Sequence, residues 1–385
     1  MELAGWAAWA LVAVWVGLVA APGRYWTTAV RLPVAPDPPA WPAVAVVVPA
    51  RDEAVVLACT LPGLAAQDYP GPAEVVVVDD RSGDATAEVA RSAGTGGRLA
   101  VTVVEGLDRP AGWAGKLWAL HQGVARAVAP PALAPPEWIL FTDADIEHRP
   151  GSLRRLVAFA LADERDAVSL MARLRVDTGW ERLIVPAFVY FFAQLYPFRL
   201  VAGRGRTAAA AGGCVLVRRA ALDAAGGVAA VRGAVIDDVA LARALGHSGA
   251  RLWLGLADDV CSVRAYPHLG DLWHMVARSA FTQLRYSAAL LAATLVGLVL
   301  VYLGPPVALV AGLATGRPLL AAAGATGWAV MTASYLPMVR YHRLAPLWAL
   351  SLPVAALVYA AMTLDSARRH WIGGVEWKGR RYQPG

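Results

Sequence analysis

The chain begins and ends in long apolar stretches, and a region of shorter apolar runs lies between them. Leu3 to Pro22 is an apolar run of about 20 residues, which at roughly 1.5 Å per residue is long enough for one helix to cross a bilayer. Three more apolar stretches lie near the C-terminus: Ala288 to Ala314, Pro318 to Met338 and Pro346 to Leu364. We therefore predict an N-terminal transmembrane anchor over 1–23 and a transmembrane region of about three hydrophobic segments over 288–364.

In the middle of the chain, short β-branched runs alternate with alanine-rich segments that are long enough for helices. The runs that predict strands are VAVVVP, EVVVVDD, LAVTVV and WILFTD. Because these runs are apolar almost throughout, they indicate a mostly parallel sheet that helices cover on both faces. The pattern predicts an α/β domain over 43–270. Ligands of such sheets bind at the carboxyl ends of the strands.

The remaining segments connect or flank these regions. Five prolines between Pro33 and Pro42 predict a stiff, extended linker over 24–42. Residues 271–287 are predicted to form an interfacial segment, and residues 365–385 a basic tail. The first arginines follow the N-terminal apolar run, so the positive-inside rule predicts a multi-pass protein of the cell (inner) membrane with a cytoplasmic α/β domain.

Three full crossings after a cytoplasmic domain place the basic tail outside, against the same rule. We therefore expect one C-terminal segment to be re-entrant or interfacial, near Pro305, Pro306 or Pro353.

Composition agrees with a protein that has a membrane part and a polar part. Of the 385 residues, 57% are hydrophobic and 17% are charged. The net charge of +6 comes from arginines spread among acids, which argues against nucleic acid and favours an anionic membrane or a phosphorylated substrate. Cys59, Cys214 and Cys261 show no CxxC spacing, so neither a disulfide framework nor a zinc site is supported. No obligate protein partner is evident.

Two aspartates follow the run WILFT. Asp143 and Asp145 have i, i+2 spacing, so they can converge on one ligand, and Ala144 between them leaves room for backbone approach. Two close carboxylates repel unless a cation or protons intervene, and a hard divalent ion is the usual solution. A solvated turn and a phosphatase-like nucleophile remain open, whereas an EF-hand is disfavoured because His148 stands where its glycine is required.

Acidic and basic residues also follow the first two strands. Asp79 and Asp80 end the second strand and can accept hydrogen bonds from a base or a ribose, whereas Asp84 is interpreted as a helix cap. After the first strand, Arg51 and Glu53 lie in the same layer.

Three further motifs are candidates for binding or catalysis. Lys116 opens a helix after two glycines, which suits a diphosphate, although the phosphate-loop motif is absent. Gly212 and Gly213 form a paired-glycine turn where the backbone must approach another group closely, and the acceptor is the candidate for that group. Asp237 and Asp238 precede a helix, either as caps or as a catalytic base.

Aromatic residues crowd the run FVYFFAQLYPF, from Phe188 to Phe198. This density favours an interfacial helix that meets lipid, with core packing as the alternative. Arg285 and Tyr286 lie at the edge of the next span, where snorkelling is the ordinary explanation of an arginine.

Seven of these motifs follow one another in a characteristic order: VVVPARDEA, VVVVDDRSGD, GWAGKLWAL, FTDADI, GGCVLVRR, IDDVAL and TQLRY. In this order the sequence resembles the membrane-bound inverting glycosyltransferases of family 2. Within that family it resembles the hopene-associated and ceramide-glucosyltransferase-like branch. The resemblance implies a GT-A fold with a Rossmann-like sheet, a nucleotide-diphosphate sugar as donor, and Mg²⁺ or Mn²⁺.

The resemblance also assigns roles to individual residues. Asp143 and Asp145 match the metal-binding DxD pair, Asp238 matches the general base beside Asp237, and Arg285 with Tyr286 matches the QxxRW motif that stabilises the leaving diphosphate. The implied nucleotide-sugar-binding residues are Pro49, Ala50, Arg51, Glu53, Asp79, Asp80, Lys116, Asp143, Ala144 and Tyr286.

Two positions depart from the family's pattern. Thr282 stands at the glutamine position of QxxRW, with Gln283 one place later, and Asp237 replaces a glutamate. The expected function is transfer of a sugar, with a UDP-sugar as the expected donor, to a lipid hydroxyl, as in hopanoid or other glycolipid biosynthesis. A processive polysaccharide synthase is the alternative, and an inactive membrane scaffold is a weaker one.

Overall fold

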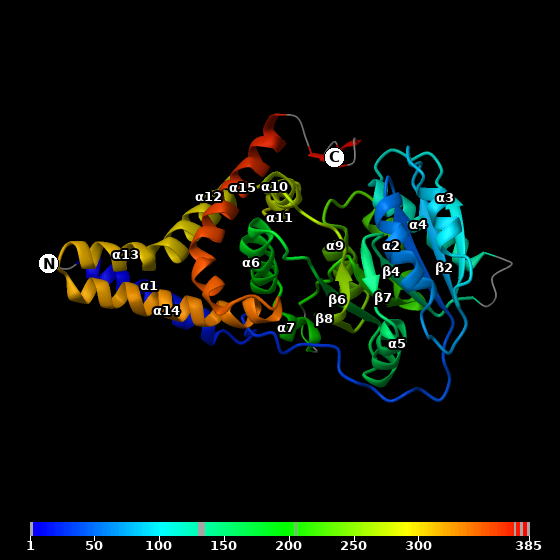
Figure 1. Cartoon of the computed structure of the whole chain (residues 1–385), viewed down its shortest axis with the longest axis horizontal. Coiled ribbons are helices and arrows are strands. Elements are labelled where there is room, and N and C mark those ends of the chain that lie inside the picture. Colours follow the sequence, from blue (N-terminus) through cyan, green and yellow to red (C-terminus); the bar gives the residue numbers. More distant parts are fainter. Residues whose placement is uncertain are drawn as a thin grey trace. The chain divides into compact units, whose positions relative to one another are not determined.

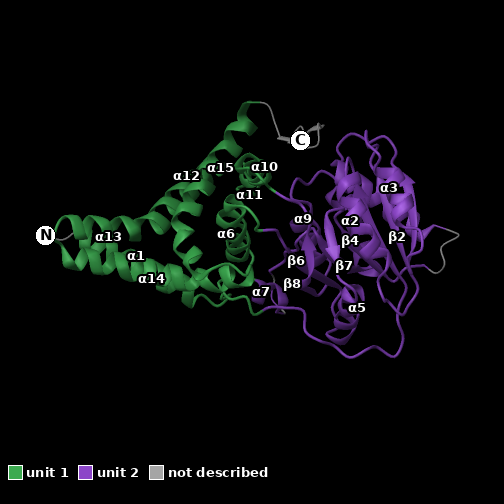
Figure 2. Ribbon diagram, in the orientation of Figure 1, with its two compact units in different colours: residues 1–29, 176–197, 266–384 green, residues 30–175, 198–265, 385 purple. Residues whose placement is uncertain are grey.

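The computed structural model describes residues 3–129, 135–203, 205, 207–372, 375–377 and 380–382. The chain forms two compact units, which Figure 2 colours separately. The sheet unit comprises Val30–Arg175 and Phe198–Ala265, and the helical unit comprises Met1–Ala29, Val176–Pro197 and Tyr266–Pro384. In the basic tail, residues 373, 374, 378, 379 and 383–385 lie outside the described residues.

The sheet unit contains a mixed eight-stranded sheet with the order β3-β2-β1-β4-β7-β6-β8-β5 (Figure 1). The strands are β1 (Val44–Ala50), β2 (Ala73–Asp79), β3 (Ala100–Glu105), β4 (Trp138–Thr142), β5 (Ile146–His148), β6 (Ala167–Arg173), β7 (Cys214–Arg218) and β8 (Leu252–Ser262). Neighbours pair in parallel from β3 to β4 and between β6 and β8, whereas β7 and β5 run antiparallel. All four predicted runs are therefore strands.

Helices cover both faces of the sheet, as the apolar strands predict. The helices and the 3₁₀ turn of this unit are α2 (Ala54–Ala65), α3 (Thr86–Ala93), α4 (Gly115–Val128), α5 (Ser152–Ala162), α7 (Phe198–Ala202), α8 (Arg219–Ala224), η1 (Val228–Val231) and α9 (Asp237–His247). In β1, Val46 and Val48 pack in one core with leucines of α2 and α5, whereas Ala45 packs on the α4 side. Alternate residues of β1 thus pack into the hydrophobic cores on opposite faces of the sheet.

One glycine sets how closely α4 approaches the sheet. A Cβ atom added at Gly123 would lie 2.4 Å from Cγ1 of Val47, a distance that side chains do not tolerate. The absence of a side chain lets the helix backbone settle directly on β1. This contact fixes the height of α4, whose first turn carries Lys116.

Strand direction gathers polar residues at one edge of the sheet. The parallel strands β1, β2 and β4 end at this edge, and β8 ends there too because β7 reverses the direction once and β6 reverses it again. The antiparallel β7 begins at the same edge, directly after Gly212 and Gly213. The edge thus collects the residues that follow these four strands and those that precede β7.

The segment 30–42 contacts the sheet unit and does not form a separate linker. Arg31 forms an isolated parallel bridge with Leu256, where the Leu256 N–H donates to the Val30 carbonyl at 2.9 Å. Leu32 is buried in the same core as β1. The proline-rich stretch therefore runs as an ordered strap along the sheet unit from residue 30 onward.

The helical unit holds the apolar segments. Its elements are α1 (Leu3–Ala20), α6 (Gly179–Leu195), α10 (Leu269–Ala277), α11 (Ala280–Gln283), α12 (Ala288–Gly297), η2 (Leu298–Leu303), α13 (Gly304–Ala314), α14 (Pro318–Tyr341), η3 (Pro346–Ser351), α15 (Leu352–Ile372), β9 (Val375–Trp377) and β10 (Arg380–Tyr382). Among the described residues, three helical stretches are long and apolar enough to cross a membrane, namely Ala288–Ala314, Pro318–Tyr341 and Pro346–Ile372. They match the three predicted segments.

Prolines mark the irregular turns within these stretches. A π-helical turn, Leu298–Leu303, precedes Pro305 and Pro306 in α13. The 3₁₀ turn Pro346–Ser351 likewise precedes Pro353 in α15. Proline lacks the N–H that an α-helix requires, so the preceding turn adopts another hydrogen-bond pattern.

Helix α6 differs from the predicted interfacial helix. Tyr190 is fully buried in the helical unit, and its hydroxyl lies 2.7 Å from Oγ of Ser334 in α14. Tyr196 is buried as well and accepts a hydrogen bond from Gln283 Nε2 at 2.6 Å. The aromatic run is therefore explained by packing within the unit, because its tyrosines have polar partners inside the protein.

Candidate active site

The two aspartates after β4 lie in a turn that the backbone holds rigidly. The N–H of Ile146 donates to the Asp143 carbonyl at 3.1 Å, and that of Val263 donates to the Asp145 carbonyl at 2.8 Å. Ala144 is buried, and its carbonyl accepts a hydrogen bond from Thr60 Oγ1 at 2.7 Å. The carbonyls of all three residues of this turn are thus hydrogen-bonded, which fixes the backbone positions from which the two carboxylates extend.

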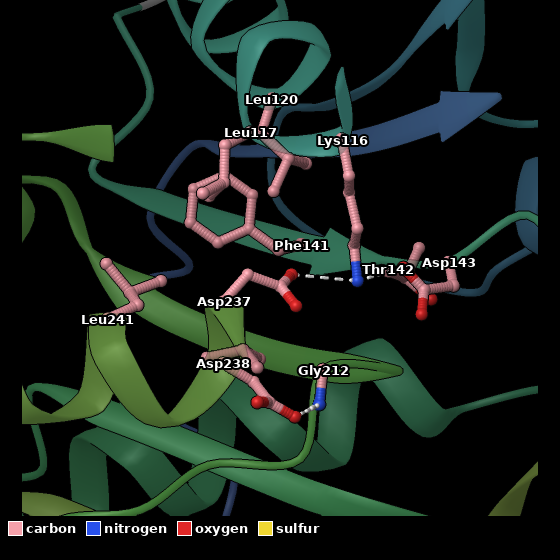
Figure 3. Close-up of a pocket in the computed structure, with 11 residues that line it drawn as sticks. Lys116, Leu117, Leu120, Phe141, Thr142, Asp143, Gly212, Asp237, Asp238 and Leu241 are labelled. Carbon is pink, nitrogen blue, oxygen red and sulfur yellow. Dashed lines mark hydrogen bonds and ion pairs between the residues drawn. The ribbon is translucent and has the colours of Figure 1, made fainter. Parts of the chain in front are cut away.

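Lys116 joins two of the predicted carboxylates (Figure 3). Its Nζ lies 2.8 Å from Oδ1 of Asp143 and 3.0 Å from Oδ2 of Asp237. Burial disfavours the ammonium charge, but the two carboxylates outweigh burial and raise the pKa of Lys116. For Asp143, burial outweighs the attraction of Lys116 and raises its pKa. The site thus contains a fixed positive charge between two carboxylates, and burial disfavours the ionised form of Asp143.

Asp238 is held by main-chain donors at the start of α9. Its Oδ2 accepts from the Gly212 N–H at 2.8 Å, and its Oδ1 accepts from its neighbour, the Val239 N–H, at 2.7 Å. Burial and then the Asp237 carboxylate raise the pKa of Asp238 to about 6, although Lys116 and the two N–H donors oppose the shift. A carboxyl with a pKa near the operating pH is suited to accept a proton.

The predicted close approach at Gly212 is made to the chain's own polar groups. A Cβ atom there would lie 3.3 Å from both Oδ2 of Asp238 and Nζ of Lys116. At Gly213 a Cβ would meet Cδ1 of Ile146 at 3.0 Å instead. Gly212 therefore leaves the Asp238 carboxylate and the Lys116 ammonium uncovered.

These groups line one pocket, shown in Figure 3. Its polar groups come from the end of β4 and the residue after it, from α4 and α9, and from the turn before β7, and apolar side chains of α4, β4, β7 and α9 form its wall. The lining residues are Lys116, Leu117, Leu120, Phe141, Thr142, Asp143, Gly212, Val215, Asp237, Asp238 and Leu241.

A second cluster links the end of β1 to the turn after β4 through Arg264. Its Nε donates to Oδ2 of Asp145 at 2.8 Å, and its NH2 donates to Oε1 of Glu53 at 2.8 Å. Ser262 Oγ also donates to Oδ2 of Asp145, at 3.1 Å. Sequence reasoning missed Arg264, which belongs to no motif. Its one signal was its position directly after the last long strand of the domain.

A third group lies at the ends of β1 and β2. Arg51 NH1 donates to the Asp80 carbonyl at 2.7 Å and lies 3.9 Å from its carboxylate, while Asp80 is 2% exposed. Asp79 Oδ1 accepts from the Ser82 N–H at 3.2 Å, so Asp79 shapes the turn. Asp84 accepts from the N–H groups of Ala54 and Thr86, the first residues of α2 and α3, although the N-cap residue of α3 is Ala85.

The last two residues of β1 also take part in this group. Ala50 is 2% exposed, and its carbonyl accepts from the Asp80 N–H at 2.8 Å. Pro49 precedes it in register with Val78 of β2. These two residues therefore fix the spacing between Arg51 and Asp80 through the backbone.

Arg285 and Tyr286 belong to the helical unit, whereas the other predicted site residues belong to the sheet unit. Both adopt left-handed backbone conformations, with φ of 53° and 56°. The Tyr286 ring stacks on His370 at 4.4 Å between centroids, and its hydroxyl accepts from Thr282 Oγ1 at 3.2 Å. Two consecutive non-glycine residues in this conformation store strain, which is typical of functional segments.

The donor set after β4 suits a hard divalent cation that a ligand helps to bind. No group of three or more His, Cys, Asp or Glu residues able to hold a metal occurs within the described ranges. Asp143 and Asp145 offer carboxylate oxygens from adjacent positions, each now paired with a cationic side chain. Mg²⁺ commonly takes one or two carboxylates and completes its shell with phosphate oxygens and water. The residues present fit such a site.

Comparisons with known proteins place this geometry in context. Residues 42–266 match the model described as glycosyltransferase like family 2, which spans more than half of the 385 residues. The mannosyltransferase PcManGT from Pyrobaculum calidifontis, solved in complex with GDP-Man and Mn²⁺, is similar with 23% identity and a TM-score of 0.56, over 96% of this chain and 99% of that chain. The likeness to this structure shows a shared fold.

A further solved structure resembles part of the chain. It is glucosyl-3-phosphoglycerate synthase from Mycobacterium tuberculosis, in complex with Mn²⁺, uridine diphosphate and glucosyl-3-phosphoglycerate. Its identity is 18% and its TM-score 0.40, over 63% of this chain and 80% of that chain. None of the curated proteins matches the sequence.

Proposed function

The chain belongs to glycosyltransferase like family 2, and we propose that it transfers a sugar from a nucleotide-diphosphate sugar to a lipid hydroxyl with inversion. Its sheet unit has the GT-A-like fold that the resemblance implied. The observation that carries the proposal is the pocket in which the Gly212 N–H holds the Asp238 carboxylate close to the Lys116–Asp143 ion pair. A proton acceptor and a cation for a phosphate leaving group thus share one site.

The donor is proposed to bind along the edge formed by the ends of β1, β2 and β4. The buried Asp80 carboxylate and Arg51 offer an acceptor and donors to a base and ribose. Asp143 and Asp145 would hold Mg²⁺ or Mn²⁺, which supplies charge neutralisation for the diphosphate. PcManGT was solved with GDP-Man and Mn²⁺, so guanosine and uridine sugars both belong in the donor panel, with a UDP-sugar expected.

Asp238 is proposed to act as the general base. Its carboxylate removes the proton from the acceptor hydroxyl, and the hydroxyl oxygen then attacks the anomeric carbon while the bond from that carbon to the diphosphate oxygen breaks. Lys116 is proposed to stabilise the negative charge that develops on the diphosphate. The role of Arg285 at the leaving diphosphate stays a prediction from the resemblance. A single displacement of this kind inverts the anomeric configuration.

The acceptor is proposed to be a lipid, reached from the cytoplasmic face of the cell membrane. Support comes from the three helical stretches long enough to cross a membrane and from the apolar wall of the pocket. A processive polysaccharide synthase is the alternative function. It is less favoured because such an enzyme needs a channel of several helices for its polymer. A hopanoid is one acceptor within the proposed lipid class.

Partition of the product tests the acceptor class. Purified full-length protein in lipid vesicles, supplied with radiolabelled nucleotide sugar and Mn²⁺, is expected to transfer label into the organic phase on extraction. Mass spectrometry of that phase then identifies the glycosylated lipid. Label that remains in the aqueous phase as a polymer would contradict lipid transfer and favour the synthase. An Asp238→Asn preparation provides the background.

A further inference from the structure

A chain of buried polar side chains lies behind the turn that carries Asp143 and Asp145. His148 is 1% exposed, and its Nε2 lies 2.8 Å from Oγ1 of Thr142, the last residue of β4. The Thr142 hydroxyl donates to the Gly213 carbonyl at 2.9 Å. The mechanism proposed above uses neither side chain, although Thr142 lines the pocket and Gly213 adjoins the residue that holds Asp238.

The hydrogen bonds determine where the proton of His148 lies. Thr142 has one hydroxyl hydrogen, which it gives to the Gly213 carbonyl, so its oxygen must accept from an Nε2–H of His148. Nδ1 is then the acceptor nitrogen of the ring, and it lies 3.2 Å from Oγ of Ser152, whose hydroxyl donates to Oε1 of Gln67 at 3.3 Å. Burial lowers the pKa of His148 to about 4, which keeps the ring neutral in this arrangement.

Gln67 holds the end of this series of hydrogen bonds that lies farthest from Thr142. Its Nε2 donates to the carbonyls of His148 and Arg149 at 3.2 and 3.0 Å, and its Oε1 accepts from the Leu153 N–H at 3.2 Å. The main chain of His148 is therefore fixed, and the position of its ring fixes the rotamer of Thr142. Connected buried hydrogen bonds of this kind favour one local geometry.

The turn before β7 is held from both neighbouring strands. On the β4 side, Thr142 holds the Gly213 carbonyl. On the β6 side, Ser169 Oγ accepts from the Ala211 N–H at 2.8 Å and donates to the Ala211 carbonyl at 3.2 Å. Gly212 lies between these two fixed residues, and its N–H holds Oδ2 of Asp238.

We propose that Thr142 and His148 are positioning residues, which orient the Gly212–Gly213 turn so that its N–H group places the Asp238 carboxylate for proton removal. This inference rests on the proposed function, because it requires Asp238 to be the base. Neither residue contacts the reacting atoms. Their effect passes through the hydrogen bonds from His148 to Thr142, from Thr142 to Gly213, and from Gly212 to Asp238.

Substitution of Thr142 tests the proposal in the full-length protein. Thr142→Val removes the hydroxyl with little change in shape, and it is expected to lower kcat roughly tenfold, because small misplacements of a catalytic group are costly. The KM for the donor is expected to stay within about twofold, since the donor site is unchanged. Thr142→Ser keeps the hydroxyl and is expected to restore most of kcat.

The pH profile gives a second readout that a purely structural role would not move. The Gly212 N–H opposes the rise in the pKa of Asp238, so loosening this hydrogen bond raises the pKa further. In Thr142→Val the acid limb of kcat should therefore shift to higher pH. Asp237, Lys116 and the N–H of Val239 also face Asp238, and all are retained in this variant.

Tyr69→Phe is the matched control, because it removes a buried hydroxyl that donates to the Pro42 carbonyl at 2.6 Å, outside the pocket. It should lower the melting temperature without changing kcat or the acid limb. The proposal is overturned if Thr142→Val keeps wild-type kcat, or if Thr142→Ser loses as much as Thr142→Val. Failure of the proposed base is a different result, in which Asp238→Asn itself keeps wild-type turnover.

Discussion

Asp238→Asn is expected to lower kcat about 10²–10⁴-fold, the contribution that a positioned general base typically makes. Asparagine retains an oxygen that can accept from the Gly212 N–H, which now binds Oδ2 at 2.8 Å, so the turn before β7 should keep its shape. The amide cannot remove a proton from the acceptor. Donor binding should therefore survive, measured as an unchanged dissociation constant by titration calorimetry beside single-turnover rates.

The pH dependence supplies a signature for the same residue. Asp238 acts as a base only when ionised, and its pKa is raised to about 6, so the kcat of the wild type should fall as the pH drops through that value. The Asn variant should lack this limb. The control is Asp166→Asn. Asp166 directly precedes β6, at the opposite edge of the sheet, and its carboxylate pairs with Arg218, so this variant also loses a paired carboxylate. Lost donor binding in Asp238→Asn would show that the residue has been misassigned.

Asp145→Ala is expected to abolish metal-dependent nucleotide binding. Partners in the outer shell of a metal site already contribute about 10–100-fold to metal affinity, and a direct ligand should contribute at least as much. Arg264 would keep its ion pair with Glu53, so the end of β1 should remain in place. Calorimetry with nucleoside diphosphate, with Mn²⁺ and then with a chelator, measures the effect.

Two comparisons make this test specific. In the wild type the chelator should weaken nucleotide binding strongly, whereas in Asp145→Ala it should change little, because the metal contribution is already lost. Asp166→Ala removes a carboxylate that pairs with Arg218 and Arg251, and it should bind nucleotide like the wild type. An Asp145→Ala protein with wild-type affinity and a wild-type response to chelator would contradict the metal site.

Much of the fold and part of the site can be predicted from the sequence. The apolar, β-branched runs predict all four strands, and in β1 and β4 nearly every residue is buried. Lys116, Asp143, Asp237 and Asp238 were each identified separately, and the structure joins them in one pocket. Strand direction explains this convergence, since the carboxyl ends of parallel strands share an edge.

The remaining features depend on long-range pairing that one sequence does not reveal. Arg264 meets Asp145 because β8 ends beside β5, and no local pattern predicts that pairing. The resemblance assigns no role to His148, yet its ring bonds to Thr142 on the preceding strand. The aromatic run of α6 was assigned to an interface because composition alone does not show which helices cover it.

The anomeric configuration of the product tests the central claim most directly. Purified protein is given a nucleotide sugar of known configuration, Mn²⁺ and lipid acceptor, and the glycosidic linkage of the extracted product is measured by NMR. An inverted linkage is the result expected of a single displacement with Asp238 as the base, and Asp238→Asn should form this product about 10²–10⁴-fold more slowly. A product with retained configuration would contradict that mechanism.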